Sequence, residues 1–329
     1  MRIKLCDIPI ALKTDIPKIQ ADWQAIFACH LQQQNNQQPA IEIQALPLDQ
    51  APPSDLNRPI TQFESTNGTY QLALTTDGRS KLTLASGAIV TLPNLGLPYD
   101  KSQPIQSELY ITPNLANFGQ VEDITFALLA PIMRRFKVYI VHAFGVVHPT
   151  KPEAVLIIGR SGQGKTTTGL SLIEEGWKYL GNDAIFLSIN AQGKIVAWPS
   201  PGQINLHPKS VTLLNQSQYL PKSLATGPNG KYHFSPQTFA QDKLGPTEVR
   251  LQLFPKIVNH AGKCQLEHLP NSIALSQTIE QSVDHWDTIA MEDHFTFLEQ
   301  LNSQTKSFKA KNTTDLKSLS NALLNYSKQ

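Results

Sequence analysis

The sequence predicts an α/β protein built from two domains, a smaller α+β domain followed by a larger α/β domain. Three observations lead to this prediction. The chain has 329 residues, which is enough for two domains. Apolar residues first recur at helical spacing and then alternate with polar ones, as they do in strands. Later, residues 154–176 run from a buried-strand pattern through a glycine-rich turn into a helical pattern.

The first domain is predicted to span residues 1–118. Its first helix is expected within residues 14–32, where Thr14 or Asp15 can cap it and Pro17 fits the first turn. One face of this helix is apolar, with Ile16, Ile19, Trp23, Ile26 and Phe27. The next stretch, "QQQNNQQP", is predicted to be a polar surface loop. Residues 68–92 alternate around Asp77 and Gly78, which predicts a β-hairpin.

The second domain is predicted to span residues 119–329. "VEDITFALLAPIMRRF" predicts a helix that Pro131 kinks or ends, and its Arg134 and Arg135 are expected to face solvent. "KVYIVHAFGVVH" and "EAVLIIG" predict strands before the glycine-rich turn, and "VRLQLFPKIV" predicts a later strand. "DHWDTIAMEDH" is expected to form an exposed amphipathic helix. "TTDLKSLSNALLNYSKQ" predicts a closing helix whose apolar side carries Leu316, Leu319, Leu323 and Leu324.

Composition excludes several classes of protein. Charged residues make up 16% of the chain, the formal net charge is +2, and the basic residues are scattered, so no nucleic-acid surface is expected. Cys6, Cys29 and Cys264 are far apart and odd in number, so neither a disulfide framework nor a zinc spacing is indicated. Asp7 interrupts the N-terminal apolar run, and no window reaches the ~18 apolar residues of a membrane helix. We therefore expect a cytoplasmic protein that binds neither membrane nor nucleic acid.

The glycine-rich turn "GRSGQGKT", residues 159–166, matches the phosphate-loop pattern G-x-x-x-x-G-K-S/T. Its glycines let successive backbone N–H groups point inward, and the following helix adds positive charge from its N-terminus. Lys165 can reach the β- and γ-phosphates of ATP, and the Thr166 hydroxyl suits Mg²⁺. A plain glycine-rich turn with a surface lysine would not explain why strand, loop and helix follow in this order. The predicted nucleotide contacts are Gly159, Ser161, Gly162, Gln163, Gly164, Lys165, Thr166 and Thr167.

A carboxylate follows in "WKYLGNDAIFL", which predicts a second strand with Asn182 and Asp183 inside it. An acid among strand residues is costly unless it faces an ion or a partner. Asp183 could bind Mg²⁺ together with Thr166, or it could accept the proton of an attacking hydroxyl. The alternative is that Asn182 and Asp183 form a turn between two short strands.

These residues resemble the HPr kinase/phosphorylase superfamily, and more closely its diverse HPr kinase-related members. The helix after the loop ends at Gly176, eleven residues past Lys165, and the second acid of the family's Asp-Asp pair falls on Asp183, eighteen past it. The first acid of the pair is replaced by Asn182. The segment "HAFGVV" is similar to the family's strand before the loop, which carries a histidine, here His142. The resemblance is good over residues 124–206 and says little about residues 1–118.

The resemblance implies a P-loop kinase domain akin to phosphoenolpyruvate carboxykinase, with mixed strands. It also implies Mg²⁺- and ATP-dependent phosphorylation of a serine-like hydroxyl in a peptide or protein. Asp183, His142 and Lys165 would then be the catalytic residues, and Thr166 and Asp183 the metal ligands. The N-terminal domain would recognise the acceptor, and a homo-oligomer is possible because related enzymes form oligomers.

Two departures from the family keep alternatives open. Asn182 removes one carboxylate, and the glycine-rich signature of true HPr kinases is replaced by "AWPSPGQINLHPKS", so neither HPr nor the reverse reaction is predicted. The chain could instead be an ATP-binding sensor or scaffold without phosphoryl transfer, or a small-molecule kinase. Lys231 is either a second cation for the transferred phosphoryl group or a solvated lysine.

Overall fold

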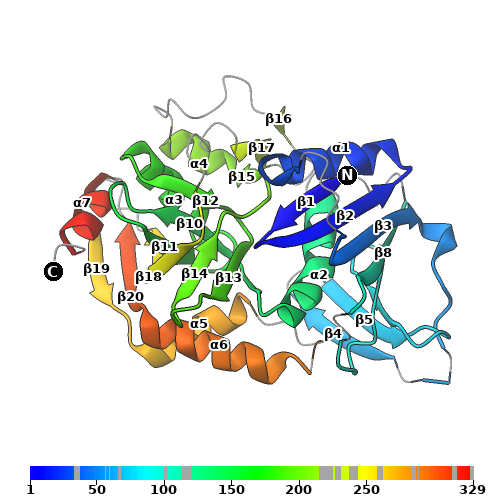
Figure 1. Cartoon of the computed structure of the whole chain (residues 1–329). Helices are drawn as coiled ribbons and strands as arrows, with labels where there is room; N and C mark the ends of the chain where they lie inside the picture. The colour runs from blue at the N-terminus through cyan, green and yellow to red at the C-terminus, as the bar shows by residue number, and fades with distance from the viewer. Residues whose placement is uncertain are drawn as a thin grey trace. The chain divides into compact units, whose positions relative to one another are not determined.

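The computed structural model describes the chain except residues 33–37, 56, 59, 66–67, 100–101, 113–119, 215–224, 227–230, 237–243, 258–261, 283–286, 288, 313–316 and 327–329. Two compact units are formed, each described by itself below (Figure 1). Unit 1 consists of Met1–Val138 and Asp284–Asp293, and unit 2 of Tyr139–Val283 and His294–Gln329. The predicted boundary after residue 118, most of the predicted polar loop at 32–39, and Leu316 lie outside the described residues.

Unit 1 is built on an eight-stranded sheet with the order β1-β2-β3-β8-β7-β6-β5-β4. The pairs β2–β3 and β3–β8 are parallel and the other neighbours are antiparallel. The hairpin predicted around Gly78 is confirmed, since β5 pairs with β6 and Gly78 has a φ of 82°. The strands are β1 (Arg2–Leu5), β2 (Ile8–Thr14), β3 (Ile41–Pro47), β4 (Thr61–Ser65), β5 (Gly68–Leu74), β6 (Ser80–Thr83), β7 (Ile89–Leu92) and β8 (Ile105–Ile111).

Two helices complete unit 1, α1 (Pro17–Ile26) and α2 (Gln120–Arg135), besides the short 3₁₀ turns Ala28–His30 and Leu48–Gln50. They contact each other through a buried hydrogen bond, in which Trp23 Nε1 donates to Thr125 Oγ1 at 3.0 Å. The predicted cap of α1 was wrong. Ile16 occupies the N-cap position without a side-chain bond, and the Thr14 hydroxyl accepts from the backbone N–H of Ile16 instead.

The end of α2 is buried, which corrects the expectation that Arg134 and Arg135 face solvent. The side chain of Arg134 is 3% exposed, and that of its partner Asp287 is 1% exposed. Arg134 Nε lies 2.8 Å and Arg135 Nη1 2.6 Å from Asp287 Oδ2. The expected exposed helix over 284–294 was also wrong, because Asp287 is buried here and α6 begins only at Met291. The carboxylate that pairs the two arginines comes from a distant part of the chain, so local sequence could not indicate it.

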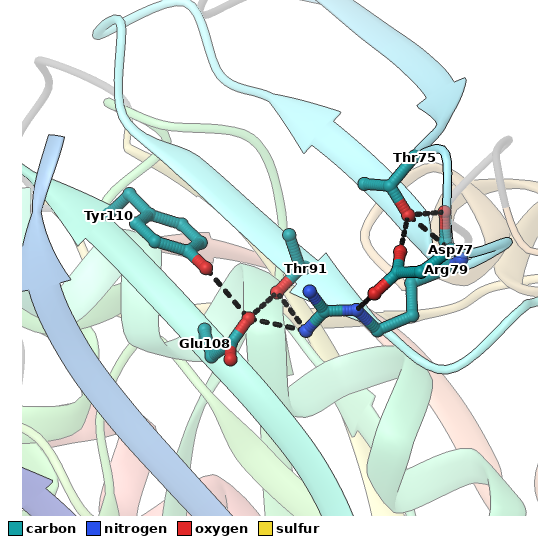
Figure 2. Close-up of polar contacts among 6 residues, drawn as sticks. All are labelled: Thr75, Asp77, Arg79, Thr91, Glu108 and Tyr110. Carbon is teal, nitrogen blue, oxygen red and sulfur yellow. Dashed lines mark hydrogen bonds and ion pairs between the residues drawn. The ribbon is translucent and has the colours of Figure 1, made fainter. Parts of the chain in front are cut away.

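A polar network links the turn before β6 to strands β7 and β8 of unit 1, and Figure 2 shows Arg79, Thr91 and Tyr110 converging on Glu108. Glu108 Oε2 accepts hydrogen bonds from Thr91 Oγ1 at 2.7 Å, from Tyr110 OH at 2.8 Å and from Arg79. Burial alone would raise the pKa of Glu108, but these three donors outweigh it, and the pKa lies below its usual value. Burial and the bond to Glu108 raise the pKa of Tyr110 to about 12. The network joins β7 and β8 to the turn that precedes β6.

Unit 2 is built on a mixed sheet, as predicted. Its main path has the order β12-β10-β11-β18-β14-β13-β9, and β20 extends it by pairing with β18 and β19. The pairs β11–β18 and β18–β20 are parallel, and the other pairs are antiparallel. The strands are β9 (Tyr139–Val141), β10 (Ala143–Val147), β11 (Glu153–Ile158), β12 (Lys178–Gly181), β13 (Ile185–Ile189), β14 (Ile195–Trp198), β18 (Thr247–Ile257), β19 (Gln265–His268) and β20 (Lys306–Asn312).

Helices cover both faces of this sheet (Figure 1). On one face, α5 (Asn271–Glu280) and α6 (Met291–Gln304) pack with buried residues such as Ala274 and Phe297. On the other face, α3 (Lys165–Glu174) and α7 (Lys317–Tyr326) bury Leu172 and Leu319. A three-stranded sheet, β15 (Ile204–Leu206), β17 (Tyr232–Phe234) and β16 (Ala225–Thr226), shares that second cluster, and α4 (Pro208–Leu213) follows β15.

The elements that frame the glycine-rich loop agree with their predictions. Strand β11 ends at Ile158, and α3 begins at Lys165. Gly176, with a φ of 91°, follows the end of α3 as expected. Strand β18 and helix α7 are confirmed as well, with Leu319 and Leu323 buried. The loop is therefore held between a central strand and a helix packed on that strand.

Candidate functional site

The glycine-rich loop depends on two left-handed backbone positions. Gly162 has a φ of 82° and Gly164 a φ of 96°, and residues with a Cβ rarely adopt such angles. Gly164 is the N-cap of α3, and no side chain caps the first turn of this helix. The N–H groups at a helix N-terminus have no partner within the helix and attract anions. The loop geometry therefore suits an anionic ligand.

The side chain of Gln163 closes the loop from within. Its Oε1 accepts a hydrogen bond from the backbone N–H of Arg160 at 2.9 Å. A Cβ added at Gly159 would overlap this oxygen, so the end of the Gln163 side chain would have to move. Of the other predicted contact residues, Ser161 is exposed, whereas the Thr167 hydroxyl donates to Ser210 Oγ of α4 at 2.7 Å. The hydroxyl of Thr167 is thus used within the protein.

Lys165 lies inside the loop and is only 6% exposed. Its Nζ donates to the backbone oxygens of Gly159, at 2.7 Å, and Arg160, at 3.3 Å. Burial, opposed by the charge of Asp183 and reinforced by that of Lys231, lowers the pKa of Lys165 to about 8. A cation held in this way is destabilised by its surroundings, and an incoming anion would relieve that cost.

Two strand interruptions face each other beside the loop. Strand β12 pairs with β10 and β13 pairs with β9, so the break at His142 lies opposite the break at residues 182–184. The prediction that Asn182 and Asp183 lie inside a strand was wrong, and the alternative of a turn between two short strands is what the structure shows. Asp183 has a φ of 63°, which is uncommon for a residue with a Cβ.

Asn182 connects the loop to this bend. Its Oδ1 accepts a hydrogen bond from the Thr166 hydroxyl at 3.3 Å. Its Nδ2 donates to Asp183 Oδ2 at 3.0 Å and to the backbone oxygen of Gln203 at 3.1 Å. Because the NH₂ group has two acceptors and the oxygen has one donor, these contacts fix the orientation of the amide. Thr166, predicted to share a metal with Asp183, is thus linked to Asp183 through Asn182.

The carboxylate of Asp183 is held by two amides. Asn182 and Asn205 both donate to its Oδ2, each at 3.0 Å. Sequence analysis did not single out Asn205, which is the middle residue of β15. Asn205 is a polar residue between the buried Ile204 and Leu206. That pattern could have identified it, because Asp183 was predicted to be functional as a polar residue among strand residues.

His142 lies between β9 and β10 rather than on a strand, and its ring contacts the bend. Nδ1 lies 2.9 Å from the backbone oxygen of Asp183, and since a carbonyl can only accept, Nδ1 carries the proton. Burial, together with the charge of Lys165, lowers the pKa of His142, so the ring is neutral near pH 7. The charge of Lys231 lowers the pKa of both His142 and Lys165, so Lys231 belongs to the same electrostatic environment.

Oxygen donors rather than a preformed cage are available for a metal. The described residues contain no group of three or more His, Cys, Asp or Glu side chains that could hold a metal ion. Thr166 Oγ1, Asn182 Oδ1 and the Asp183 carboxylate are nevertheless joined by the hydrogen bonds described above. Mg²⁺ usually takes one or two protein ligands and completes its shell with water and phosphate oxygens. These residues fit such a partial site.

Comparisons with known proteins give little. No family model matches the chain, and no curated protein matches it. Among solved structures, an HPr(Ser) kinase/phosphatase from Coxiella burnetii aligns with a TM-score of 0.28 and 14% identity, covering 57% of this chain and 98% of that one. A similarity of this size carries no conclusion about the site. Across the residues described, no helix is both long and apolar enough to span a membrane.

Proposed function

We propose that the chain is a Mg²⁺- and ATP-dependent phosphotransferase resembling HPr kinase, which transfers the γ-phosphoryl group to a serine-like hydroxyl of a peptide or protein. One observation carries the proposal. The hydrogen bonds from Thr166 to Asn182 and from Asn182 to Asp183 join an anion-suited loop to a carboxylate. Phosphoryl transfer needs both, a cradle for phosphates and an acceptor for the proton of the attacking hydroxyl.

The loop would hold the triphosphate. Backbone N–H groups of residues 159–167 and the N-terminus of α3 would bind phosphate oxygens, and Lys165 would exchange its two carbonyl contacts for the β- and γ-phosphates. Lys231 would add a second positive charge, which suits a transition state with negative charge spread over three oxygens. Mg²⁺ would be held by Thr166 directly and by Asp183 through a bound water, with Asn182 Oδ1 beside them, and would neutralise phosphate charge.

The transfer step would use Asp183 as the proton acceptor. The acceptor hydroxyl oxygen attacks the γ-phosphorus, the bond from that phosphorus to the bridging oxygen breaks, and ADP leaves with the electron pair. The hydroxyl proton passes to Asp183 Oδ1, since Oδ2 already accepts two hydrogen bonds. His142 would keep the bend in place through its bond to the Asp183 backbone oxygen. Asp183 then releases its proton to solvent.

Several features of this proposal concern partners. Residues 1–118 would recognise the peptide or protein acceptor, the enzyme would act in the cytoplasm, and a homo-oligomer would be its working form. Photocrosslinking of an acceptor peptide, followed by mapping of the labelled residues, tests the first point. Light scattering of the purified protein tests the third.

One experiment decides between this proposal and its alternatives. Calorimetry would measure Mg-ATP binding, and γ-labelled ATP would report transfer to peptides, proteins and small molecules, for the wild type, Asp183→Asn and the exposed control Glu299→Gln. We expect all three to bind ATP, and only the wild type and the control to transfer label. Binding with no transfer by any of them favours the sensor or scaffold that Asn182 suggested. Transfer to small molecules alone favours a small-molecule kinase. Absence of ATP binding refutes the proposal.

A further inference from the structure

Strand β15 contacts the candidate site through Asn205 and is held in place by its buried residues. Ile204 and Leu206 are fully buried in the cluster that also contains Leu170 and Leu172 of α3. Strand β15 also pairs with β17, and Leu206 lies opposite Tyr232 there. The residues around Asn205 are thus fixed by core packing and by backbone pairing. The backbone position of Asn205 is therefore set by the fold.

The same strand reaches both residues of the bend. Asn205 Nδ2 donates to Asp183 Oδ2 at 3.0 Å, and the backbone oxygen of Gln203, just before β15, accepts from Asn182 Nδ2 at 3.1 Å. Asn182 also donates to the same Asp183 oxygen. One of the two donors that hold the carboxylate therefore comes from the bend itself, and the other comes from a separate, anchored element.

We propose that Asn205 is a positioning residue for the phosphoryl-transfer step, which holds Asp183 Oδ2 so that Oδ1 accepts the proton of the attacking hydroxyl. The inference rests on the proposed function. The carboxylate of Asp183, a residue with a left-handed backbone, could turn about its side-chain bonds if only the neighbouring Asn182 held it. The second amide removes that freedom, and catalytic groups lose efficiency when they are displaced by even about 1 Å.

Three variants separate positioning from folding. Asn205→Asp is isosteric but replaces the amide donor with a carboxylate, which would lie 3.0 Å from the Asp183 oxygen and repel it. Asn205→Ala removes the donor without adding charge, and Asn205→Gln keeps the donor on a longer side chain. The matched control is Gln300→Ala, which removes an exposed amide that bonds to the Gly193 backbone far along the chain from the bend.

The assay measures phosphate release from Mg-ATP with water as the acceptor, so that no acceptor has to be known, and calorimetry gives the Kd for Mg-ATP. We expect kcat to fall by about 10- to 100-fold in Asn205→Asp and Asn205→Ala, as for other residues that orient a catalytic group. The Kd should stay within about threefold, because Asn205 is not among the proposed nucleotide contacts. Asn205→Gln should recover part of kcat, and Gln300→Ala should match the wild type.

A second measurement needs no turnover. In ¹H–¹⁵N spectra of the nucleotide-free protein, the side-chain NH₂ signal of Asn205, identified by its loss in Asn205→Ala, should shift in Asp183→Asn. An unmoved signal shows that the contact is absent and overturns the inference. If the wild type releases phosphate and the Asn205 variants keep its kcat, the inference is overturned and the proposed function stands. If the wild type neither binds ATP nor releases phosphate, the proposed function fails first and the catalytic role of Asn205 fails with it.

Discussion

The state of Lys165 makes nucleotide affinity depend on pH in a calculable way. Burial lowers the pKa of this lysine from 10.5 to about 8 in the nucleotide-free protein. If Lys165 binds the phosphates of ATP, the bound state favours the charged ammonium, and its pKa rises again. Above pH 8, binding must therefore take up a proton. Affinity should fall as the pH rises from 7 to 9.

The size of this fall follows from the protonated fraction of Lys165. With a pKa of about 8, roughly nine tenths of the ammonium is protonated at pH 7 and roughly one tenth at pH 9. The Kd for Mg-ATP should thus rise about tenfold, or ~1.4 kcal/mol, over this interval. His142 contributes no opposing change, because its pKa is lowered from 6.5 and it stays neutral throughout.

Isothermal calorimetry at pH 7, 8 and 9, in two buffers with different ionisation enthalpies, measures both the affinity and the proton uptake. Lys165→Arg is the matched control, because a guanidinium stays charged over this range and should give a flat profile. A wild-type Kd that changes less than about twofold between pH 7 and pH 9, with no proton uptake, would refute the assignment of Lys165 to the phosphates.

Three further predictions concern stability. Asp287→Asn should lower the free energy of unfolding by about 3–5 kcal/mol in thermal denaturation, because it leaves the buried Arg134 without its counter-charge. A loss below ~1 kcal/mol would contradict the buried ion pair. Gly169→Ala should lower the free energy of unfolding by about 1–3 kcal/mol in urea denaturation, because the added Cβ overlaps the Phe144 ring. Adding Phe144→Leu to this variant should restore part of the loss. An unchanged urea midpoint in Gly169→Ala alone would argue against the close contact. The pKa of Glu108 is lowered on folding, so its stabilising contribution is present above pH 4.5 and is lost as the pH falls through the lower folded value. Glu108→Gln should flatten that part of the stability–pH curve, and parallel curves for the two proteins would contradict the network.

Sequence reasoning worked where the signal was local. The order of β11, loop and α3, and the helix end at Gly176, depend on residues next to one another in the chain. The apolar pattern also ran on through His142 and through Asn182 and Asp183, so it predicted unbroken strands. The two breaks lie opposite each other in neighbouring strands of the sheet. The apolar periodicity of one strand does not show where the strand beside it is interrupted.

Other features of the fold and the site depend on contacts between residues that lie far apart in the sequence. Asn205 lies 22 residues from Asp183, and Asp287 lies 153 residues from Arg134. The sheet of unit 1 joins β3 to β8 in parallel across more than sixty residues, with Ile41 opposite Ile105. The alternating apolar pattern of β3 is present in the sequence, but this pattern does not indicate which strand pairs with β3. Parallel pairing and buried ion pairs therefore became visible only in three dimensions.

The most direct measurement is a crystal structure with Mg²⁺ and a non-hydrolysable ATP analogue. The account predicts that the β- and γ-phosphates lie on the backbone N–H groups of residues 159–167, with Lys165 Nζ turned from the Gly159 oxygen to the phosphates. It also predicts that Asp183 Oδ2 keeps its bonds to Asn182 and Asn205 while Oδ1 faces the γ-phosphate. An analogue bound elsewhere, or a γ-phosphate remote from Asp183, would contradict the claim that loop and carboxylate form one phosphoryl-transfer site.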